Sequence, residues 1–112
     1  MLSKASNAQL HQAVPVFAAL GDDVRLSLVT RLARGESLSI ARLTAGLPIT
    51  RQAVTKHLRV LEDAGLITGA RQGREQVWEL KPEGLREAQR YLGIIDRQWV
   101  EALGRLKTFV EK

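Results

Sequence analysis

The stretch that most constrains the fold of this chain is residues 49–66, ITRQAVTKHLRVLEDAGL, because both ends of a helix are marked in it. Thr50 can cap the start by accepting backbone N–H groups through its hydroxyl, and Ile49 before it has the position of a hydrophobic staple. Gly65 suits the left-handed residue just past a helix end, and Leu66 can fold back over the last turn. The sequence therefore predicts one compact helix between these two ends.

The two faces of this helix differ in chemistry. Its apolar stripe is formed by residues three to four apart, namely Val54, Leu58 and Leu61. Its polar face has no acidic residue before Glu62 and carries Arg51, Gln52, Thr55, Lys56 and Arg59. Cations, an amide and a hydroxyl on one exposed face suit the major groove of DNA, whereas a solvated amphipathic helix is the alternative interpretation.

The positive charge of the chain is concentrated around this helix. The formal net charge is +5 and the sequence pI is near 10.2. Between residues 24 and 61, seven Arg or Lys residues accompany a single acid, Glu36, whereas residues 62–112 hold nine basic and nine acidic residues. Clustered cations gain free energy by releasing the counterions condensed on a polyanion, so double-stranded DNA is the expected partner. An acidic protein or an anionic lipid surface is the alternative.

Length and composition predict one ordinary globular domain over residues 1–112. Hydrophobic residues make up 45% of the chain and charged residues 26%, which excludes a disordered chain. No apolar run approaches the roughly 18 residues that span a bilayer, and residues 1–14 lack the apolar core of a secretory signal. We therefore expect no membrane partner and a cytoplasmic location. The absence of cysteine agrees with that location and excludes disulfides, thiolate metal sites and cysteine nucleophiles.

A first helix is expected over about residues 8–20, where the apolar residues Leu10, Ala13, Val14, Phe17 and Ala18 form one face. Pro15 interrupts this pattern, so the continuous helix is expected to start near that residue or to bend there. The residues before about position 8 are polar and are expected to fray.

A helix-turn-helix unit is expected over residues 40–64. Before this unit, Asp22 can cap the start of the helix that follows it, and residues 37–39 can add a short strand. Ser39 can then cap a brief helix from Ile40 to Ala45, which a glycine-containing turn separates from the longer basic helix. A short helix, a tight turn and a longer basic helix in this order make a helix-turn-helix.

A hairpin is expected after that unit. Residues 66–71 and 76–80 are short segments rich in strand-forming residues, and Gly73 between them supplies the backbone freedom that a turn requires. Such a hairpin behind a basic helix is typical of a wing, whose tip residues Arg71 and Arg74 could reach the backbone or minor groove of DNA. A plain hairpin with a solvated tip is the alternative.

The C-terminal segment, residues 83–112, has a heptad-like apolar seam. The seam residues recur at alternating spacings of three and four: Leu85, Ala88, Leu92, Ile95, Trp99, Ala102, Leu106 and Phe109. A helix of about 28 residues extends roughly 40 Å, longer than a small three-helix core can cover. Part of the seam is therefore expected to pack against a second copy of the chain, with packing wholly inside the protomer as the alternative.

Three segments of the chain together resemble the ArsR family of winged-helix transcriptional regulators, which are dimeric bacterial repressors. The segment FAALGDDVRLSLVTRLARG is similar to the entry segment of the family. The segment LTAGLPITRQAVTKHLRVLEDAGLI is similar to its helix-turn-helix, with the ending HL-x-x-L-x-x-AGL. The segment TGARQGREQVWEL is similar to its wing. The resemblance covers roughly residues 16–82 and implies a mainly α fold with a small β-hairpin, in which the terminal helices form a dimer interface.

The chain departs from the pattern of the family at the positions that hold metal in its metal-sensing members. Gly-Asp-Asp-Val at positions 21–24 replaces the usual Ala-Asp-Pro-Thr but keeps the capping Asp. Where sensing members have paired cysteines this chain reads SLSIARL, and its C-terminal helix has no histidine. Its two histidines, His11 and His57, are far apart in sequence. We therefore expect no metal site of the known family types and no cofactor, while the effector, if there is one, stays undetermined.

The sequence as a whole predicts a sequence-specific DNA-binding regulator, a repressor that binds an inverted-repeat operator as a homodimer. The residues expected at base edges are Arg51, Gln52, Thr55 and Lys56. The residues expected at phosphates or on the wing side are Arg42, Thr50, Arg59, Arg71 and Arg74. The residues expected in the dimer interface are Phe17, Leu85, Leu92, Ile95, Trp99, Leu106 and Phe109.

Two other classes of function compete with this prediction. A winged-helix module that joins proteins without binding DNA is the first, and the charge concentrated in residues 24–61 argues against it. An enzyme is the second, and the chain has neither a Gly-rich phosphate loop nor a nucleophile and base at motif spacing. We therefore expect no enzymatic activity.

Overall fold

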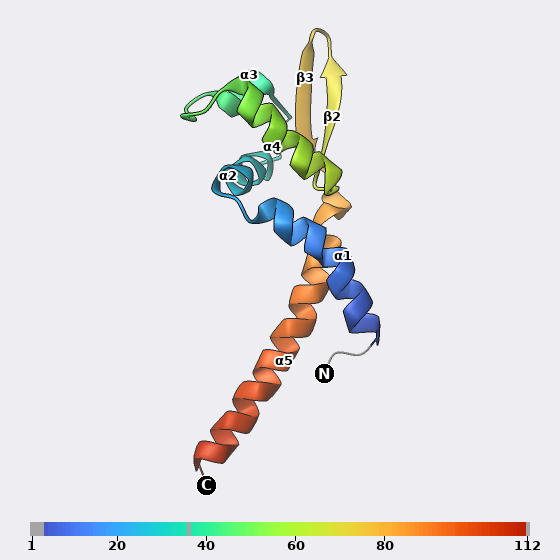
Figure 1. The fold of residues 1–112 in the computed structure, drawn as a ribbon, viewed down its shortest axis with the longest axis vertical. Helices are drawn as coiled ribbons and strands as arrows, with labels where there is room; N and C mark the ends of the chain where they lie inside the picture. The colour runs from blue at the N-terminus through green and yellow to red at the C-terminus, as the bar shows by residue number, and fades with distance from the viewer. Residues whose placement is uncertain (1–3, 36, 112) are drawn as a thin grey trace.

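The structure of the protein, a computed structural model, describes residues 4–35 and 37–111. In this part of the chain, a short hairpin lies beside a group of helices, and one long helix projects from the rest (Figure 1). The elements are α1 Lys4–Leu20, α2 Asp23–Leu32, β1 Leu38–Ser39, α3 Ile40–Thr44, α4 Arg51–Asp63, β2 Ile67–Gln72, β3 Glu75–Leu80, the 3-10 helix η1 Pro82–Leu85, and α5 Arg86–Glu111. This architecture confirms the mainly α fold with a β-hairpin.

The core of the protein forms around the apolar stripe of α4. Val54, Leu58 and Leu61 are completely buried, as the spacing predicts. They pack in one cluster with buried residues of α2 and α3, among them Leu28 and Leu43. Burial of each such side chain contributes about 1.5–3 kcal/mol, so this stripe fixes which face of α4 points inward and which points outward.

Both ends of α4 have the predicted capping geometry. The Thr50 hydroxyl accepts the backbone N–H of Ala53 at 3.1 Å. At the other end Gly65 has φ +81°. Its N–H donates to the Glu62 carbonyl at 2.9 Å, and the Leu66 N–H donates to the Leu61 carbonyl at 3.0 Å. These two bonds make a Schellman motif, so the chain leaves the helix at the residue that the sequence indicates.

The helix α1 differs from its prediction. It runs from Lys4 through Pro15 to Leu20 without interruption, so the predicted fraying before residue 8 is wrong for residues 4–7, and residues 1–3 lie outside the described part. Pro15 removes one backbone hydrogen bond. Ala13, Val16 and Ala19 on either side of it are buried, and their packing outweighs that loss.

The predicted N-caps of the two helices before α4 are confirmed. The Asp22 carboxylate accepts the backbone N–H of Arg25 at 3.0 Å and so caps α2. The Ser39 hydroxyl accepts the backbone N–H of Arg42 at 3.3 Å and caps α3. The helix α3 ends at Thr44, one residue earlier than predicted.

The described strands form one antiparallel sheet in the order β1-β3-β2. β2 and β3 pair up to Gln72 opposite Glu75, so the turn between them has only two residues, Gly73 and Arg74. Gly73 has φ +64°, while Arg74 has a negative φ, as in a type II′ hairpin turn. The strands therefore reach closer to the tip than predicted.

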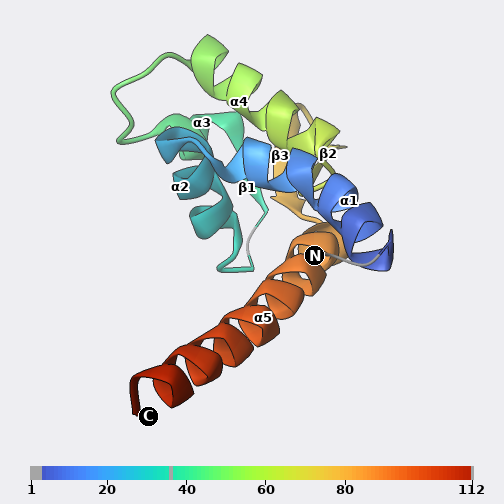
Figure 2. The ribbon, with the colours of Figure 1, turned by 60° about the horizontal axis from the view of Figure 1, so that its bottom comes forward.

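The helix α5 makes the protein elongated. The principal extents are 66 × 28 × 22 Å and the radius of gyration is 18.3 Å, compared with about 13 Å for a compact domain of this length. The first turns of α5 lie against α1, while the later turns project away from the other elements (Figure 2). The predicted helix of about 28 residues is thus a short η1 turn followed by 26 residues of α5. Among the described helices, none has the length and apolarity to cross a membrane.

Candidate nucleic-acid interface

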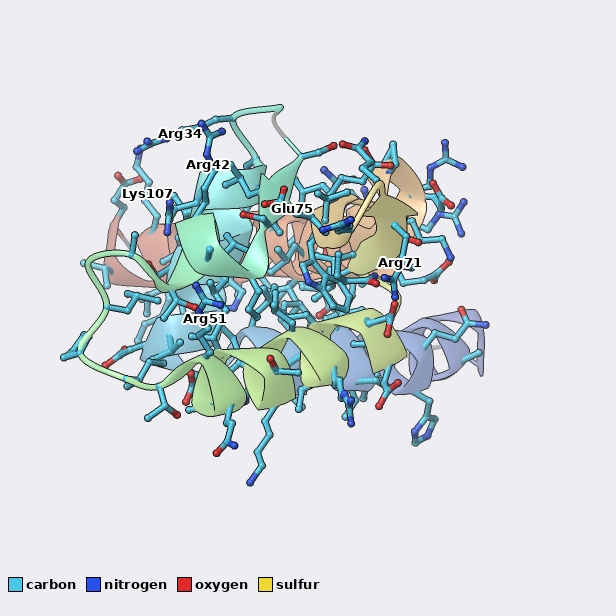
Figure 3. All side chains as sticks on the ribbon, turned by 90° about the horizontal axis from the view of Figure 1, so that it is seen from above. Arg34, Arg42, Arg51, Arg71, Glu75 and Lys107 are labelled. Carbon is cyan, nitrogen blue, oxygen red and sulfur yellow. The ribbon has the colours of Figure 1, made fainter. Side chains whose placement is uncertain are left out.

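The polar face of α4 is open to solvent. Arg51, Gln52, Lys56 and Arg59 are exposed and Thr55 is half-buried, on the side of the helix opposite the buried stripe. Figure 3 shows Arg51 near the start of α4, which lies at the outside of the helical bundle. The structure thus brings the four predicted base-edge residues onto one exposed helix surface.

Thr55 offers its methyl group more than its hydroxyl. Its hydroxyl donates to the backbone carbonyl of Arg51 at 2.8 Å, one helical turn earlier. A hydroxyl held in this way is not free to donate to a base. The γ-methyl group is the part of this side chain that remains for an apolar contact with a thymine methyl.

A groove runs along α4 between α3 and the hairpin. Near the start of α4 it has a volume of about 460 Å³ and is lined by Ile40, Arg51, Gln52, Thr55, Lys56 and Arg59. Toward the hairpin it continues over about 360 Å³ and is lined by Ile40, Thr55, Arg59, Glu62, Gln76 and Trp78. The shared lining makes the two parts one surface, to which α3, α4 and β3 all contribute.

Four lining residues of this groove were not predicted as site residues: Ile40, Glu62, Gln76 and Trp78. Ile40 reads in the sequence as an apolar helix position, and Gln76 as the first residue of a strand. Glu62 marks the acidic limit of the α4 face. Only the packing of α3 and β3 against α4 places them together, and the sequence carries no spacing that signals it.

The predicted phosphate residues come from α3, α4 and its N-cap, β2 and the hairpin turn. Arg42 on α3, Arg71 on β2 and Arg74 in the hairpin turn are exposed, and Figure 3 labels the first two. Arg59 lines both parts of the groove. The Thr50 hydroxyl already accepts a backbone N–H as the cap of α4, so only its own proton is available to a phosphate.

Two of the seven cations counted between residues 24 and 61 serve the fold. The Arg31 guanidinium donates to the carbonyls of Leu43 and Arg42, each at 2.9 Å, at the end of α3. The Arg25 Nε donates to the Ala19 carbonyl at the end of α1. The remaining five are all exposed: Arg34, Arg42, Arg51, Lys56 and Arg59. Sequence reasoning missed this division because both contacts join residues of different helices.

His57 on α4 lies in a polar cluster with the start of α2. Its Nδ1 is 3.3 Å from the Arg25 Nη1 and 3.7 Å from the Asp22 Oδ2. The pKa of Asp22 is lowered, chiefly because its carboxylate accepts the backbone N–H of Arg25 and also because His57 and Arg25 lie nearby. Among the residues that the structure describes, no three His, Asp or Glu side chains are grouped to hold a metal ion.

The predicted interface residues divide into two groups. Phe17 and Leu85 are half-buried and pack against the core of their own protomer, where the Phe17 ring lies edge-on to Tyr91 at 6.1 Å. Ile95 is also half-buried. The others on α5 are at least half exposed, from 52% for Leu92 to 77% for Phe109, and include Trp99 and Leu106. The seam also has exposed neighbours that a strict heptad omits, namely Val100, Leu103 and Val110.

A helix-turn-helix whose second helix presents a cationic face, followed by a hairpin beside that helix, defines a winged helix-turn-helix DNA-binding protein. The family described as "Helix-turn-helix domain" matches residues 20–70. The HTH-type transcriptional regulator Rv2034 of Mycobacterium tuberculosis is 40% identical over 85 residues, which cover 76% of each chain. The HTH-type transcriptional repressor SmtB of the same species is 34% identical over 71 residues, covering 63% of this chain and 52% of SmtB.

A solved structure extends the similarity over nearly the whole chain. The ArsR-like transcriptional regulator from Rhodococcus sp. RHA1 superimposes with a TM-score of 0.74 and 32% identity, covering 91% of this chain and 95% of that chain. The chain therefore belongs to the ArsR family of helix-turn-helix transcriptional regulators. It is a DNA-binding regulator, and the resemblance that its sequence motifs indicate is confirmed.

Proposed function

We propose that the protein is a repressor that binds an inverted-repeat operator as a homodimer. The observation that carries the proposal is the exposed cationic face of α4, fixed outward by a completely buried stripe on its other side. The protein acts in the cytoplasm, and its partners are double-stranded DNA and a second copy of the chain. It needs no cofactor for this function.

The exposed face of α4 reads the operator in the major groove. Arg51 and Lys56 can donate to guanine, Gln52 can bind adenine, and the Thr55 methyl can contact thymine. The surrounding residues bind phosphates and fix the register of the helix on the duplex: Arg42, Thr50, Arg59, Arg71 and Arg74. The groove between α3, α4 and the hairpin supports this assignment, because its lining combines the four base-edge side chains with one of the phosphate residues, Arg59.

The second half of α5 holds the two copies together. Trp99, Leu106 and Phe109 are more than half exposed, along a helix that projects from its own protomer. A contiguous apolar surface of this kind marks an interaction site. In a dimer with a two-fold axis, the same patch on each copy packs against the patch on the other copy. Two copies related in this way would set their α4 helices in successive major grooves about 34 Å apart, which is why the operator is an inverted repeat.

Repression follows if the occupied operator overlaps a promoter, because bound protein then blocks access of the polymerase. The name of the related SmtB protein, a transcriptional repressor, supports this direction of control.

Selection of bound fragments from a genomic duplex pool tests the proposal. We expect recovered fragments to share an inverted repeat, and binding to fall steeply with salt because phosphate contacts release counterions. Recovery of fragments without a common motif contradicts sequence-specific binding. Failure to bind random duplex at low salt would favour a protein-interaction module instead.

Mass measurement by light scattering tests the homodimer. Trp99→Glu places a charge on the exposed apolar face of α5, so we expect this variant to be a monomer where the wild-type chain is a dimer. Glu101→Gln, at an exposed position nearby on the same helix, is the control and should stay dimeric. A wild-type chain of monomer mass at high concentration contradicts the proposal.

A further inference from the structure

Arg25 on α2 connects the end of α1 to the middle of α4. Its Nε donates to the Ala19 carbonyl at 2.6 Å and its Nη2 to the Ala18 carbonyl at 3.4 Å, both in the last turn of α1. Its Nη1 lies 3.3 Å from Nδ1 of His57 on α4. One planar guanidinium group therefore contacts both α1 and α4, and its partner on α4 lies 32 residues after Arg25 in the sequence.

A cation at the end of α1 stabilises that helix. The last carbonyls of a helix have no partner within the helix, and a positive charge there is favourable. The last turn of α1 has no basic residue of its own. Arg25 supplies the charge from the next helix, and its position is fixed because its backbone N–H is bound to the capping carboxylate of Asp22 at 3.0 Å.

The contact with His57 bears on the surface that reads DNA. His57 follows Thr55 and Lys56 directly, and its side chain is 24% exposed at the edge of the core. The buried apolar stripe resists withdrawal of α4 from the core but is not directional. A hydrogen bond to a planar guanidinium is directional, so it limits rotation and sliding of α4 as well.

We propose that Arg25 is a positioning residue for DNA recognition, which holds α4 through His57 in a fixed place relative to the end of α1. The inference rests on the proposed function, because it assumes that α4 reads the operator. It requires no contact between Arg25 and the duplex. It also ties the DNA-reading helix to α1, the helix that packs along α5.

The contact requires an acceptor on the His57 ring. The ring accepts through Nδ1 when its proton is on Nε2. Among the described residues, the charged groups near the ring are Arg25 and Asp22, both from α2, and α1 contributes the carbonyls that Arg25 holds. An amide oxygen in the place of Nδ1 could accept the same bond from Arg25, whereas an aliphatic side chain could not.

Binding measurements with a selected duplex and a scrambled one test the inference. Arg25→Lys keeps the positive charge but cannot bridge the three acceptors. Arg25→Gln loses both the charge and the bridge. We expect either variant to bind the selected duplex about tenfold more weakly, the loss typical of one hydrogen bond to a charged group. Arg34→Gln removes an exposed cation just after α2 and is the control for charge; it should weaken both duplexes alike.

Two variants of His57 separate positioning from a merely structural role. His57→Asn keeps an acceptor near the position of Nδ1, so we expect it to retain the wild-type ratio of selected to scrambled affinity. His57→Leu removes the acceptor, so its ratio should fall as it does for the Arg25 variants. The two His57 variants test the inference even if the Arg25 variants fail to fold.

Each outcome supports or overturns the inference. If the Arg25 variants melt at lower temperature but discriminate between the duplexes as the wild type does, Arg25 only stabilises the fold and the inference is wrong. The inference is also wrong if His57→Asn and His57→Leu discriminate between the duplexes equally well. If the wild-type chain does not discriminate between them, the proposed function itself fails.

Discussion

Gly84 in η1 packs against the turn that ends α4, and an alanine there has no room. A Cβ at this position would lie 2.5 Å from the Gly65 carbonyl oxygen and 2.9 Å from the Leu66 Cα. Both are backbone atoms of the turn that ends α4, so no side chain can swing aside. The Lys81 N–H also donates to the Leu66 carbonyl at 2.9 Å, which ties the two segments together next to the clash.

The cost of Gly84→Ala follows from this geometry. A carbon–oxygen contact needs about 3.3 Å, so η1 and the α4 turn must separate by about 0.8 Å from their present 2.5 Å. Overpacking of this kind costs about 1–3 kcal/mol of the free energy of unfolding. At about 4 °C per kcal/mol for a domain of this size, the melting temperature should fall by about 4–12 °C.

Thermal melts followed by circular dichroism at one fixed protein concentration measure this shift. Gly104→Ala is the matched control, because a Cβ at Gly104 meets nothing within 4 Å. There, alanine should raise stability by up to about 1 kcal/mol through its helix propensity. If Gly84→Ala melts at or above the wild-type temperature, the close approach of η1 to the end of α4 is not as described.

Three more perturbations address the DNA face, the wing and the cap of α2. Gln52→Ala should cost about 1–3 kcal/mol of operator binding and relax preference at one base pair; titration against single-position duplex variants checks this, and unaltered preference refutes the orientation of α4. Arg74→Ala should weaken all duplexes alike and reduce the salt slope by about one; in titrations at two salt concentrations, a sequence-dependent loss argues against a phosphate contact. The pKa of Asp22 is lowered in the folded state, mainly by the Arg25 N–H, so its stabilisation is complete above the ordinary value of about 3.9 and is lost as pH falls through the folded-state pKa. Melts in a pH series should therefore show a smaller acid loss for Asp22→Asn below about pH 4, and equal losses would contradict this.

The parts of the fold that the sequence predicts well are those with local signals. Thr50 and Gly65 act within a few residues of the helix ends that they define, so their roles can be read from neighbouring positions. The same holds for the Asp22 cap and for the hairpin turn at Gly73. In each case the contact lies within four residues of the signal.

The parts that could not be predicted depend on contacts between distant residues. Pro15 indicates a break, but burial of its neighbours against other elements keeps α1 continuous. Arg25 and Arg31 read as members of a cationic patch, and only their approach to carbonyls of other helices reveals a structural role. The seam of α5 gives no indication of where packing inside the protomer ends, because one period covers both the half-buried and the exposed half.

Cleavage of DNA from a reagent tethered to the protein tests the central claim most directly. The chain contains no cysteine, so Pro48→Cys, an exposed position just before α4, gives a single attachment site. On a selected duplex the account predicts two groups of cuts about one helical turn, or 34 Å, apart. The same reagent on Lys107→Cys, on the projecting part of α5, should produce no localised cuts. A single group of cuts from position 48, or cuts that appear only from position 107, would contradict two α4 helices reading neighbouring major grooves.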